Sequence, residues 1–205
     1  MASHILFVTG GCKSGKSGYA LDRANRLAPQ EKTAETAPDK LIGKTTDNPT
    51  ANPTDRTSQT TRKIFIATCQ PLDDEIQERI EKHKKERGPE WTSVETPVAL
   101  ADAIARHADA ADLVLIDCLT LWVNNLLMEQ MDDDAIQEQI RLFLAALSAS
   151  NAQIIIVSNE VGAGIVPTNR LARYFRDVAG TLNQAAAKIA DDVVWMVSGI
   201  PVRIK

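Results

Sequence analysis

A glycine-rich loop close to the start of the sequence limits the folds that this chain can adopt. An apolar run at residues 5–9 leads into Gly10-Gly11-Cys12-Lys13-Ser14-Gly15-Lys16-Ser17, and a helical pattern follows to about residue 28. The loop matches the phosphate-binding pattern G-x-x-x-x-G-K-[ST] at every fixed position, with a strand before it and a helix after it. In this arrangement backbone N–H groups and the helix N-terminus bind phosphate oxygens, so the pattern predicts a nucleotide-binding α/β protein.

Three side chains in and near this loop are candidates for binding a triphosphate and its Mg²⁺. Lys16 would contact the β- and γ-phosphates and neutralise the charge that develops during transfer, and the Ser17 hydroxyl would ligate Mg²⁺. Asp117 follows the apolar run at residues 113–116, and it would hold the same ion directly or through water. The alternative for Asp117 is to cap the helix that begins at Leu119, a role that is compatible with metal binding.

Strand and helix patterns alternate along the rest of the chain. Further strands are expected at residues 64–68, 92–95, 113–116, 153–158, 193–197 and 202–204, and further helices at about 98–107, 119–130, 134–149 and 169–190. This alternation predicts an α/β, P-loop NTPase-like fold with a mostly parallel sheet and helices on both faces. The last two strands are expected to form a short antiparallel pair at the C-terminus.

Residues 31–62 differ in composition from the segments around them. They contain nine threonines, three prolines and no aromatic residue. Such a segment buries too little apolar surface to offset the entropy of ordering it. We therefore expect a disordered or loosely attached surface insertion within one nucleotide-binding domain that spans residues 1–205; a lid is the alternative.

Charge and cysteine content exclude several classes of protein. The net charge is −4 and the pI is about 5.4, with no basic stripe, which argues against a nucleic-acid partner. Cys12, Cys69 and Cys118 are isolated, which suits a reducing compartment and predicts no disulfide. The apolar runs are too short to span a bilayer and the N-terminus does not read as a signal peptide, so we expect a cytoplasmic protein with no membrane insertion.

His83 stands out in a helical pattern that Gly88-Pro89 ends. It shares one helix face with Ile76 and Ile80. The residues around it in sequence are cationic: Lys82, Lys84, Lys85 and Arg87. Positive charge nearby favours a neutral imidazole and screens a phosphate anion, so His83 is suited to attack phosphorus. The alternative is a packed core or boundary histidine.

A second loop, Asn159–Pro167, follows an apolar strand pattern. Open α/β sheets bind ligands at the carboxyl ends of their strands. Glu160, Arg170 and Arg173 are therefore candidates to orient a polar substrate. The alternative is a helix entry loop with solvated arginines.

A phosphate loop alone is shared by kinases, motor ATPases and switch GTPases. The sequence contains no N/T-K-x-D motif for reading guanine, and it displays no clear arginine finger. A small kinase-like enzyme is the simplest interpretation. Two alternatives stay open at this point. One is a kinase with a single activity and a structural His83, and the other is a nucleotide-binding regulatory protein without turnover.

Several further motifs distinguish among these classes. They are Ile66-Ala67-Thr68, Leu72-Asp73-Asp74-Glu75, Arg79-Ile80 with His83, Trp91 with Glu95, Asp117-Cys118-Leu119-Thr120, Asn124-Asn125-Leu126-Leu127, Asn159-Glu160-Val161-Gly162, Asn169-Arg170-Leu171-Ala172-Arg173 and Ser198-Gly199-Ile200. With the phosphate loop, they resemble the bifunctional adenosylcobinamide kinase / adenosylcobinamide-phosphate guanylyltransferase family of cobalamin biosynthesis. The resemblance covers nearly the whole chain except residues 31–62.

The resemblance implies two activities and a homotrimer. ATP or GTP would phosphorylate the aminopropanol hydroxyl of adenosylcobinamide. GMP would then pass from GTP to adenosylcobinamide phosphate through a guanylyl-histidine, giving adenosylcobinamide-GDP and pyrophosphate. The family's nucleophile falls on His83, and Lys82 stands where some members have a second histidine.

The same resemblance implies a set of nucleotide contacts beyond Lys16 and Ser17. They fall on the loop Gly10–Ser17 and on Ala67, Thr68, Cys69, Lys84, Lys85, Glu86, Arg87, Glu95 and Asp117. These positions would give the cations around His83 a triphosphate to bind.

Overall fold

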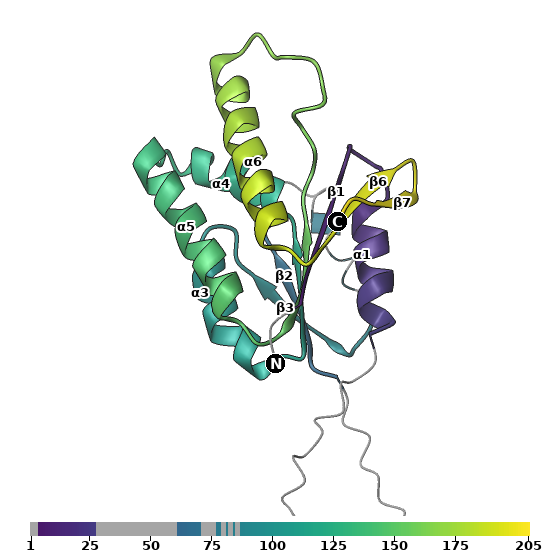
Figure 1. Cartoon of the computed structure of the whole chain (residues 1–205). Coiled ribbons are helices and arrows are strands. Elements are labelled where there is room, and N and C mark those ends of the chain that lie inside the picture. Colours follow the sequence, from purple (N-terminus) through teal and green to yellow (C-terminus); the bar gives the residue numbers. More distant parts are fainter. Residues whose placement is uncertain (1–3, 28–60, 71–76, 79–80, 82–83, 85–86) are drawn as a thin grey trace, which may run out of the picture.

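The described residues of the chain form one seven-stranded sheet with helices on both faces (Figure 1). The computed structural model describes residues 4–27, 61–70, 77–78, 81, 84 and 87–205. The strands are β1 (Ile5–Gly10), β2 (Lys63–Ala67), β3 (Trp91–Glu95), β4 (Leu113–Asp117), β5 (Gln153–Val157), β6 (Asp192–Val197) and β7 (Ile200–Arg203). They lie in the order β3-β2-β4-β5-β1-β6-β7, and every neighbouring pair is parallel except β6 and β7. The predicted fold class is confirmed.

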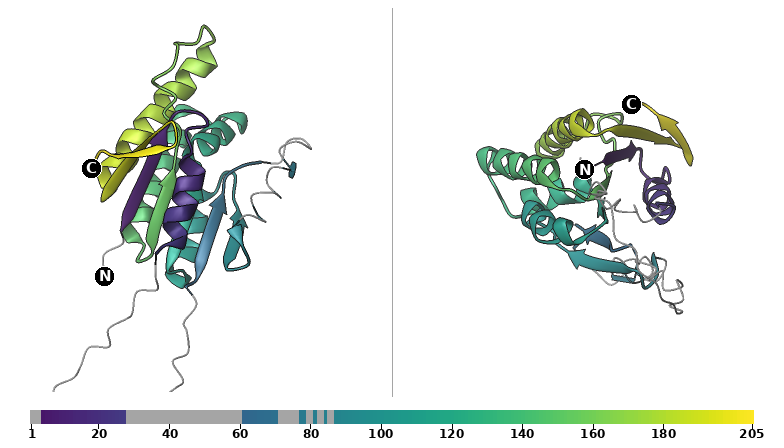
Figure 2. Two further views of the ribbon diagram at one scale, coloured as in Figure 1. Left: turned by 90° about the vertical axis from the view of Figure 1, so that its right-hand side faces the viewer. Right: turned by 60° about the horizontal axis from the view of Figure 1, so that its bottom comes forward.

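The helices cover the two faces of the sheet unequally (Figure 2). They are α1 (Lys16–Asn25), α3 (Leu100–His107), α4 (Leu119–Met128), α5 (Asp133–Ala149) and α6 (Arg170–Ile189), with a short 3₁₀ turn at Ala108–Ala110. Among these, α1 alone packs on one face, and α3, α4, α5 and α6 pack on the other. None of the described helices is long and apolar enough to span a membrane.

The central strands β1, β4 and β5 consist mostly of apolar residues because both of their faces are covered. In β4, Val114 and Ile116 belong to the core beneath the four helices, whereas Leu113 and Leu115 belong to the core beneath α1. Successive side chains of a strand point to opposite faces, which produces this division. Continuous apolar runs therefore identified the strands better than an alternating pattern would have.

The parallel strands end at one edge of the sheet, which positions the candidate site. Val8 of β1 pairs with Val157 of β5, which in turn pairs with Asp117 of β4, and Asp117 pairs with Ala67 of β2. The phosphate loop after β1 thus lies at the same edge as Asp117 and the residues after β2.

Two differences from the sequence prediction are explained by contacts in the structure, and the other described element boundaries shift by no more than three residues. The strand expected at residues 202–204 begins earlier, because Ser198 and Gly199 adopt positive φ and form a tight turn that pairs Val197 with Ile200. Residues 61–62, the end of the expected insertion, are described: the Arg62 backbone N–H donates to Asp112 Oδ2 at 2.8 Å. The rest of that insertion lies outside the described residues.

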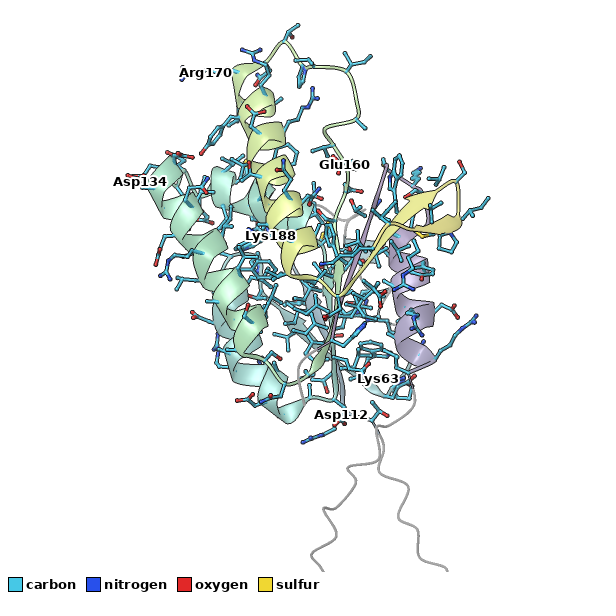
Figure 3. The ribbon with its side chains drawn as sticks, in the orientation of Figure 1. Lys63, Asp112, Asp134, Glu160, Arg170 and Lys188 are labelled. Carbon is cyan, nitrogen blue, oxygen red and sulfur yellow. The ribbon has the colours of Figure 1, made fainter. Side chains whose placement is uncertain are left out.

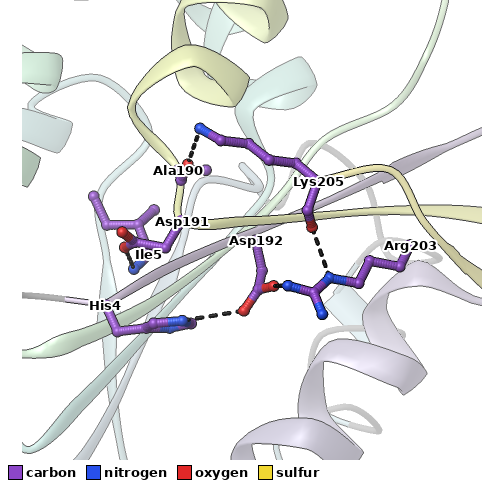
Figure 4. Close-up of polar contacts among 7 residues, drawn as sticks. All are labelled: His4, Ile5, Ala190, Asp191, Asp192, Arg203 and Lys205. Carbon is purple, nitrogen blue, oxygen red and sulfur yellow. Dashed lines mark hydrogen bonds and ion pairs between the residues drawn. The ribbon is translucent and has the colours of Figure 1, made fainter.

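A polar network at the opposite edge fastens the first strand to the C-terminal strand pair (Figure 4). Asp192 binds His4 Nε2 at 3.1 Å and Arg203 Nη2 at 2.7 Å. The neighbouring Asp191 accepts a hydrogen bond from the Ile5 backbone N–H at 2.7 Å. This network is structural, and the sequence analysis did not foresee it.

Candidate nucleotide-binding site

The phosphate loop curls tightly between β1 and α1. Lys13 and Gly15 adopt positive φ (54° and 92°), and the Ser14 N–H donates to the Gly11 carbonyl at 3.3 Å. Helix α1 begins directly after Gly15, so its free N–H groups point toward the loop. Concave backbone of this kind is an anion-binding site.

The β6–β7 turn supports the loop from one side. The Gly199 N–H donates to the Ser14 carbonyl at 3.0 Å, and a Cβ on Gly15 would lie 3.4 Å from Gly199 Cα. On Gly10, whose φ is 150°, a Cβ would lie 2.5 Å from the Met196 carbonyl oxygen. Glycine at position 10 is therefore required both by backbone conformation and by this close approach.

We expect Gly10→Ala to lower the free energy of unfolding by about 1–3 kcal/mol, because the new methyl group clashes with backbone and φ is strained. Nucleotide affinity should fall as the loop shifts. Gly11→Ala is the matched control, since no atom lies within 4 Å of its Cβ position. Urea unfolding and nucleotide titration measure both effects; equal losses in the two variants would contradict this explanation.

Lys16 is buried at the start of α1 and held against the loop. Its side chain is 7% exposed, and Nζ donates to the Gly11 carbonyl at 2.6 Å. Burial lowers the pKa of Lys16, and the negative charge of Asp117 opposes this shift. A desolvated ammonium interacts strongly with an anion, so Lys16 is suited to bind phosphate.

Two hydroxyl groups near the loop have no hydrogen-bond partner among the described residues. They are Thr9 Oγ1 at the end of β1 and Ser14 Oγ within the loop, and both atoms are buried. Buried polar atoms are normally paired. Their lack of partners fits a loop that takes up a polar ligand.

Asp117 lies at the carboxyl end of β4, directly before helix α4. The N-cap position of α4 is occupied by Cys118, whose side chain makes no capping hydrogen bond. The negative charge of Asp117 raises the pKa of both Lys16 and Arg87 against the effect of their burial. Asp117 is thus electrostatically coupled to the phosphate-loop lysine.

The Ser17 hydroxyl and the Asp117 carboxylate are suitable ligands for Mg²⁺ that is bound together with a nucleotide. Ser17 is exposed in the first turn of α1, and Asp117 is half-buried. The described residues contain no group of three His, Cys, Asp or Glu side chains that could hold a metal. Mg²⁺ commonly takes one or two protein ligands, with phosphate oxygens and water completing its shell.

Buried hydrogen bonds tie β2, β4 and α4 together beside Asp117. Thr68 Oγ1 accepts from the Cys118 N–H and donates to the Cys118 carbonyl, both at 2.8 Å. Asn125 Nδ2 donates to the carbonyls of Thr68 at 2.7 Å and Pro97 at 2.9 Å. The Thr68 side chain therefore serves the framework, and Asn125 is a positioning residue to which the sequence analysis gave no role.

Lys84 and Glu95 come together at the end of β3. Lys84 Nζ lies 2.7 Å from Glu95 Oε1 and 3.4 Å from Glu81 Oε1. The hydrogen bond that Lys84 donates to the Glu95 carboxylate raises the pKa of Lys84. Two of the residues that the resemblance assigns to the nucleotide thus form an exposed ion pair.

Arg87 is packed into the structure. It is 6% exposed, its guanidinium lies 3.8 Å from the centre of the Phe65 ring, and Nη2 donates to Ser93 Oγ at 3.3 Å. Burial lowers its pKa, opposed by the charges of Asp117 and Glu95. The positive charge of Arg87 interacts with Asp117 and Glu95, whereas its side chain packs on Phe65 of β2.

The loop between β5 and α6 rises from the same edge (Figure 3). The Glu160 N–H donates to the Gly10 carbonyl at 2.9 Å, which joins the loop to the end of β1. Arg173 Nη1 donates to the carbonyls of Pro167 at 3.1 Å and Thr168 at 2.6 Å. Arg173 therefore braces the loop, in line with the structural alternative, and Arg170 is exposed at the start of α6.

Comparison with known proteins decides the family. Residues 50–204 match the family model described as cobinamide kinase / cobinamide phosphate guanyltransferase. The chain belongs to this family. Membership makes it a bifunctional kinase and guanylyltransferase by class, as the sequence motifs predicted.

Curated relatives extend the match over the phosphate loop. The bifunctional adenosylcobalamin biosynthesis protein CobU of Salmonella typhimurium is 38% identical over 98% of this chain and 99% of its own length. CobU of Escherichia coli is 35% identical over the same shares. CobP of Pseudomonas aeruginosa is 39% identical over 69% of this chain and 81% of its own.

Part of the expected cobinamide kinase / guanyltransferase site lies outside the described residues. This applies to His83, Lys85 and Glu86, and to the helix face expected around His83. Ala67, the last residue of β2, and Cys69, two residues beyond it, are half-buried at the edge of the sheet that holds the site. Cys12, Cys69 and Cys118 form no disulfide, and burial raises the pKa of Cys118 to about 12, which makes its thiol unreactive.

Proposed function

We propose that this protein phosphorylates adenosylcobinamide with ATP or GTP and then transfers GMP from GTP to adenosylcobinamide phosphate. The observation that carries the proposal is the placement of Lys16 and Asp117 at one edge of the sheet, in a chain of the cobinamide kinase / guanyltransferase family. The products of the second reaction are adenosylcobinamide-GDP and pyrophosphate.

In the kinase step the phosphate loop holds the triphosphate and aligns it with the acceptor hydroxyl. The backbone of Gly10–Ser17 binds the phosphates, and Lys16 moves from the Gly11 carbonyl to the β/γ-phosphate oxygens. The hydroxyl oxygen bonds to the γ-phosphorus and loses its proton to solvent, as the bond to the bridging oxygen breaks and ADP or GDP leaves. Mg²⁺, held by Ser17 and Asp117 when bound, would supply charge neutralisation at the phosphates.

In the guanylyl step His83 acts as the nucleophile. Its imidazole nitrogen bonds to the α-phosphorus of GTP, and pyrophosphate leaves. A phosphate oxygen of adenosylcobinamide phosphate then bonds to the same phosphorus, and the histidine nitrogen leaves. The covalent intermediate divides one displacement into two easier ones. The cations Lys84 and Arg87 would favour the approach of the anionic acceptor.

A reconstituted assay tests the proposal. The protein, Mg²⁺, ATP and adenosylcobinamide should give adenosylcobinamide phosphate and ADP, and GTP should then give adenosylcobinamide-GDP and pyrophosphate. Mixtures lacking the corrinoid are the control. Kinase product without the GMP-transfer product would favour the one-activity kinase, and no corrinoid-dependent use of nucleotide would contradict the proposal.

Under the same proposal the protein is a homotrimer, and the C-terminal strand pair offers a surface for contact between its subunits. Trp195, Val197, Ile200 and Val202 form a hairpin patch: they share one face of β6–β7, since Trp195 pairs with Val202 and Val197 with Ile200. Each is between 41% and 65% exposed. Contiguous exposed apolar residues commonly mark a protein interface.

We expect Val197→Asp to weaken self-association at least about tenfold, because a carboxylate would be buried without a partner. Sedimentation velocity over a range of concentrations measures the effect. Met128→Asp is the control, since Met128 is 65% exposed at the end of α4 and lies outside the hairpin patch. A monomeric wild-type protein would contradict the trimer, and a Val197→Asp protein as associated as wild type would exclude the patch.

A further inference from the structure

The β5–α6 loop presents apolar side chains to solvent. Ile165 is 95% exposed, Val166 is 65% exposed, and Leu171, in the first turn of α6, is 57% exposed. Ile165 and Val166 are adjacent within the loop. We refer to Ile165, Val166 and Leu171 as the loop tip. Large apolar side chains this exposed favour contact with another apolar surface.

Side chains of α6 donate hydrogen bonds to carbonyls along the loop, although its tip is exposed. Arg176, on α6, donates from Nη2 to the Gly162 carbonyl at 2.8 Å and from Nη1 to the Ile165 carbonyl at 3.0 Å. Arg173 binds the two carbonyls that follow Val166, and Asn169 caps α6 by accepting from the Ala172 N–H at 3.0 Å. A tip that is fixed before binding loses little entropy when it binds.

The loop tip stands on the catalytic side of the sheet. The loop leaves the edge at Glu160, whose N–H binds the Gly10 carbonyl, and at Asn159, whose N–H donates to Thr120 Oγ1 at 2.7 Å. Figures 1 and 3 show the loop rising beyond the ends of β1 and β5 and returning at Arg170, whereas Lys63 and Asp112 lie at the opposite edge. The tip is therefore joined to the phosphate loop through a short, hydrogen-bonded stretch of chain.

The proposed acceptor needs a surface in this position. Its reacting hydroxyl lies at the end of a short chain attached to a corrin macrocycle, whose rim carries methyl groups and amides. A macrocycle of this size does not fit within a phosphate loop, so it must lie against neighbouring protein while the hydroxyl reaches the γ-phosphate. The hairpin patch on β6–β7, the candidate for contact with a second copy, does not include the loop-tip residues.

We propose that the loop tip, Ile165, Val166 and Leu171, binds the apolar rim of the corrin ring of the acceptor, and that Arg176 positions it. This inference rests on the proposed function, because it assigns a binding surface to that acceptor. It predicts that changes at the tip affect the corrinoid and leave the nucleotide unaffected.

The test compares steady-state constants for the two substrates of the kinase step. Ile165→Asp should raise the KM for adenosylcobinamide about tenfold or more and leave the KM for ATP unchanged. Ile165→Leu should behave as wild type. Ile204→Asp is the control, because Ile204 is 60% exposed and lies at the opposite edge, where its N–H binds the Val193 carbonyl. Arg176→Ala should raise the same KM by freeing the loop.

Labelling by GTP without corrinoid provides a second readout. The Ile165→Asp protein should form the acid-labile guanylyl adduct as wild type does, since that step does not involve the acceptor. An unchanged KM for adenosylcobinamide, an equal rise in the KM for ATP, or a change of oligomeric state would each overturn the inference. A wild-type protein without corrinoid-dependent turnover would instead overturn the proposed function and this inference with it.

Discussion

Lys16→Ala is expected to lower both the kinase and the guanylyl-transfer rates by about 10²–10³-fold, the usual effect of removing a preorganised group that stabilises a transition state. Both reactions break a phosphoanhydride bond of a triphosphate in the same loop, so one cation serves both. In the structure Lys16 is 7% exposed and lies 2.6 Å from the Gly11 carbonyl, ready to move to a phosphate. Separate assays of the two reactions measure the loss.

The variant should fold normally. Burial lowers the pKa of Lys16, which means that the folded state disfavours its charged form, so removing the charge should reduce the free energy of unfolding by no more than about 1 kcal/mol. Lys188→Ala is the matched control, because Lys188 is exposed near the end of α6. If Lys16→Ala retained both activities, the phosphate loop would be only a structural turn.

His83→Ala is expected to abolish GMP transfer, by at least about 10³-fold, while leaving the kinase activity largely intact. The reason is that His83 forms a bond to phosphorus only in the second reaction. The measurement is the ratio of guanylyl-transfer to kinase activity. It is obtained from the initial rates of adenosylcobinamide-GDP and adenosylcobinamide phosphate formation by one preparation.

His107→Ala provides the comparison for this variant. His107 is the last residue of α3 and has no assigned role in either reaction. It should leave both rates near the wild-type values. Equal loss of the two activities in His83→Ala would contradict the division of labour, because it would make His83 a structural residue as the alternative interpretation holds.

The sequence predicted the parts of the site that depend on local pattern. The phosphate loop has fixed spacing, and Asp117 follows a run of buried residues, so both could be placed before the structure was known. Parallel strands end at a common edge, and this brought Asp117 close enough to Lys16 for their charges to interact.

Contacts between distant segments could not be predicted in this way. Arg176 reaches carbonyls 11 and 14 residues earlier, and carbonyl groups carry no side-chain signal. Asn125 resembles any polar residue on a helix until α4 is docked against Thr68 and Pro97. In the sequence, Arg87 is one more cation near His83. Only the structure shows that its guanidinium packs on the Phe65 ring of β2.

If one nucleotide site performs both reactions through a guanylyl-histidine, a pulse–chase experiment should trap that intermediate and follow its transfer. The protein is incubated with Mg²⁺ and GTP labelled at the α-phosphate, freed of nucleotide, and then mixed with adenosylcobinamide phosphate. We expect acid-labile label on the protein, absent from His83→Ala, to pass entirely to adenosylcobinamide-GDP. Two outcomes would contradict a guanylyl-histidine intermediate. One is folded, GTP-binding protein that takes up no label, and the other is label that adenosylcobinamide phosphate does not remove.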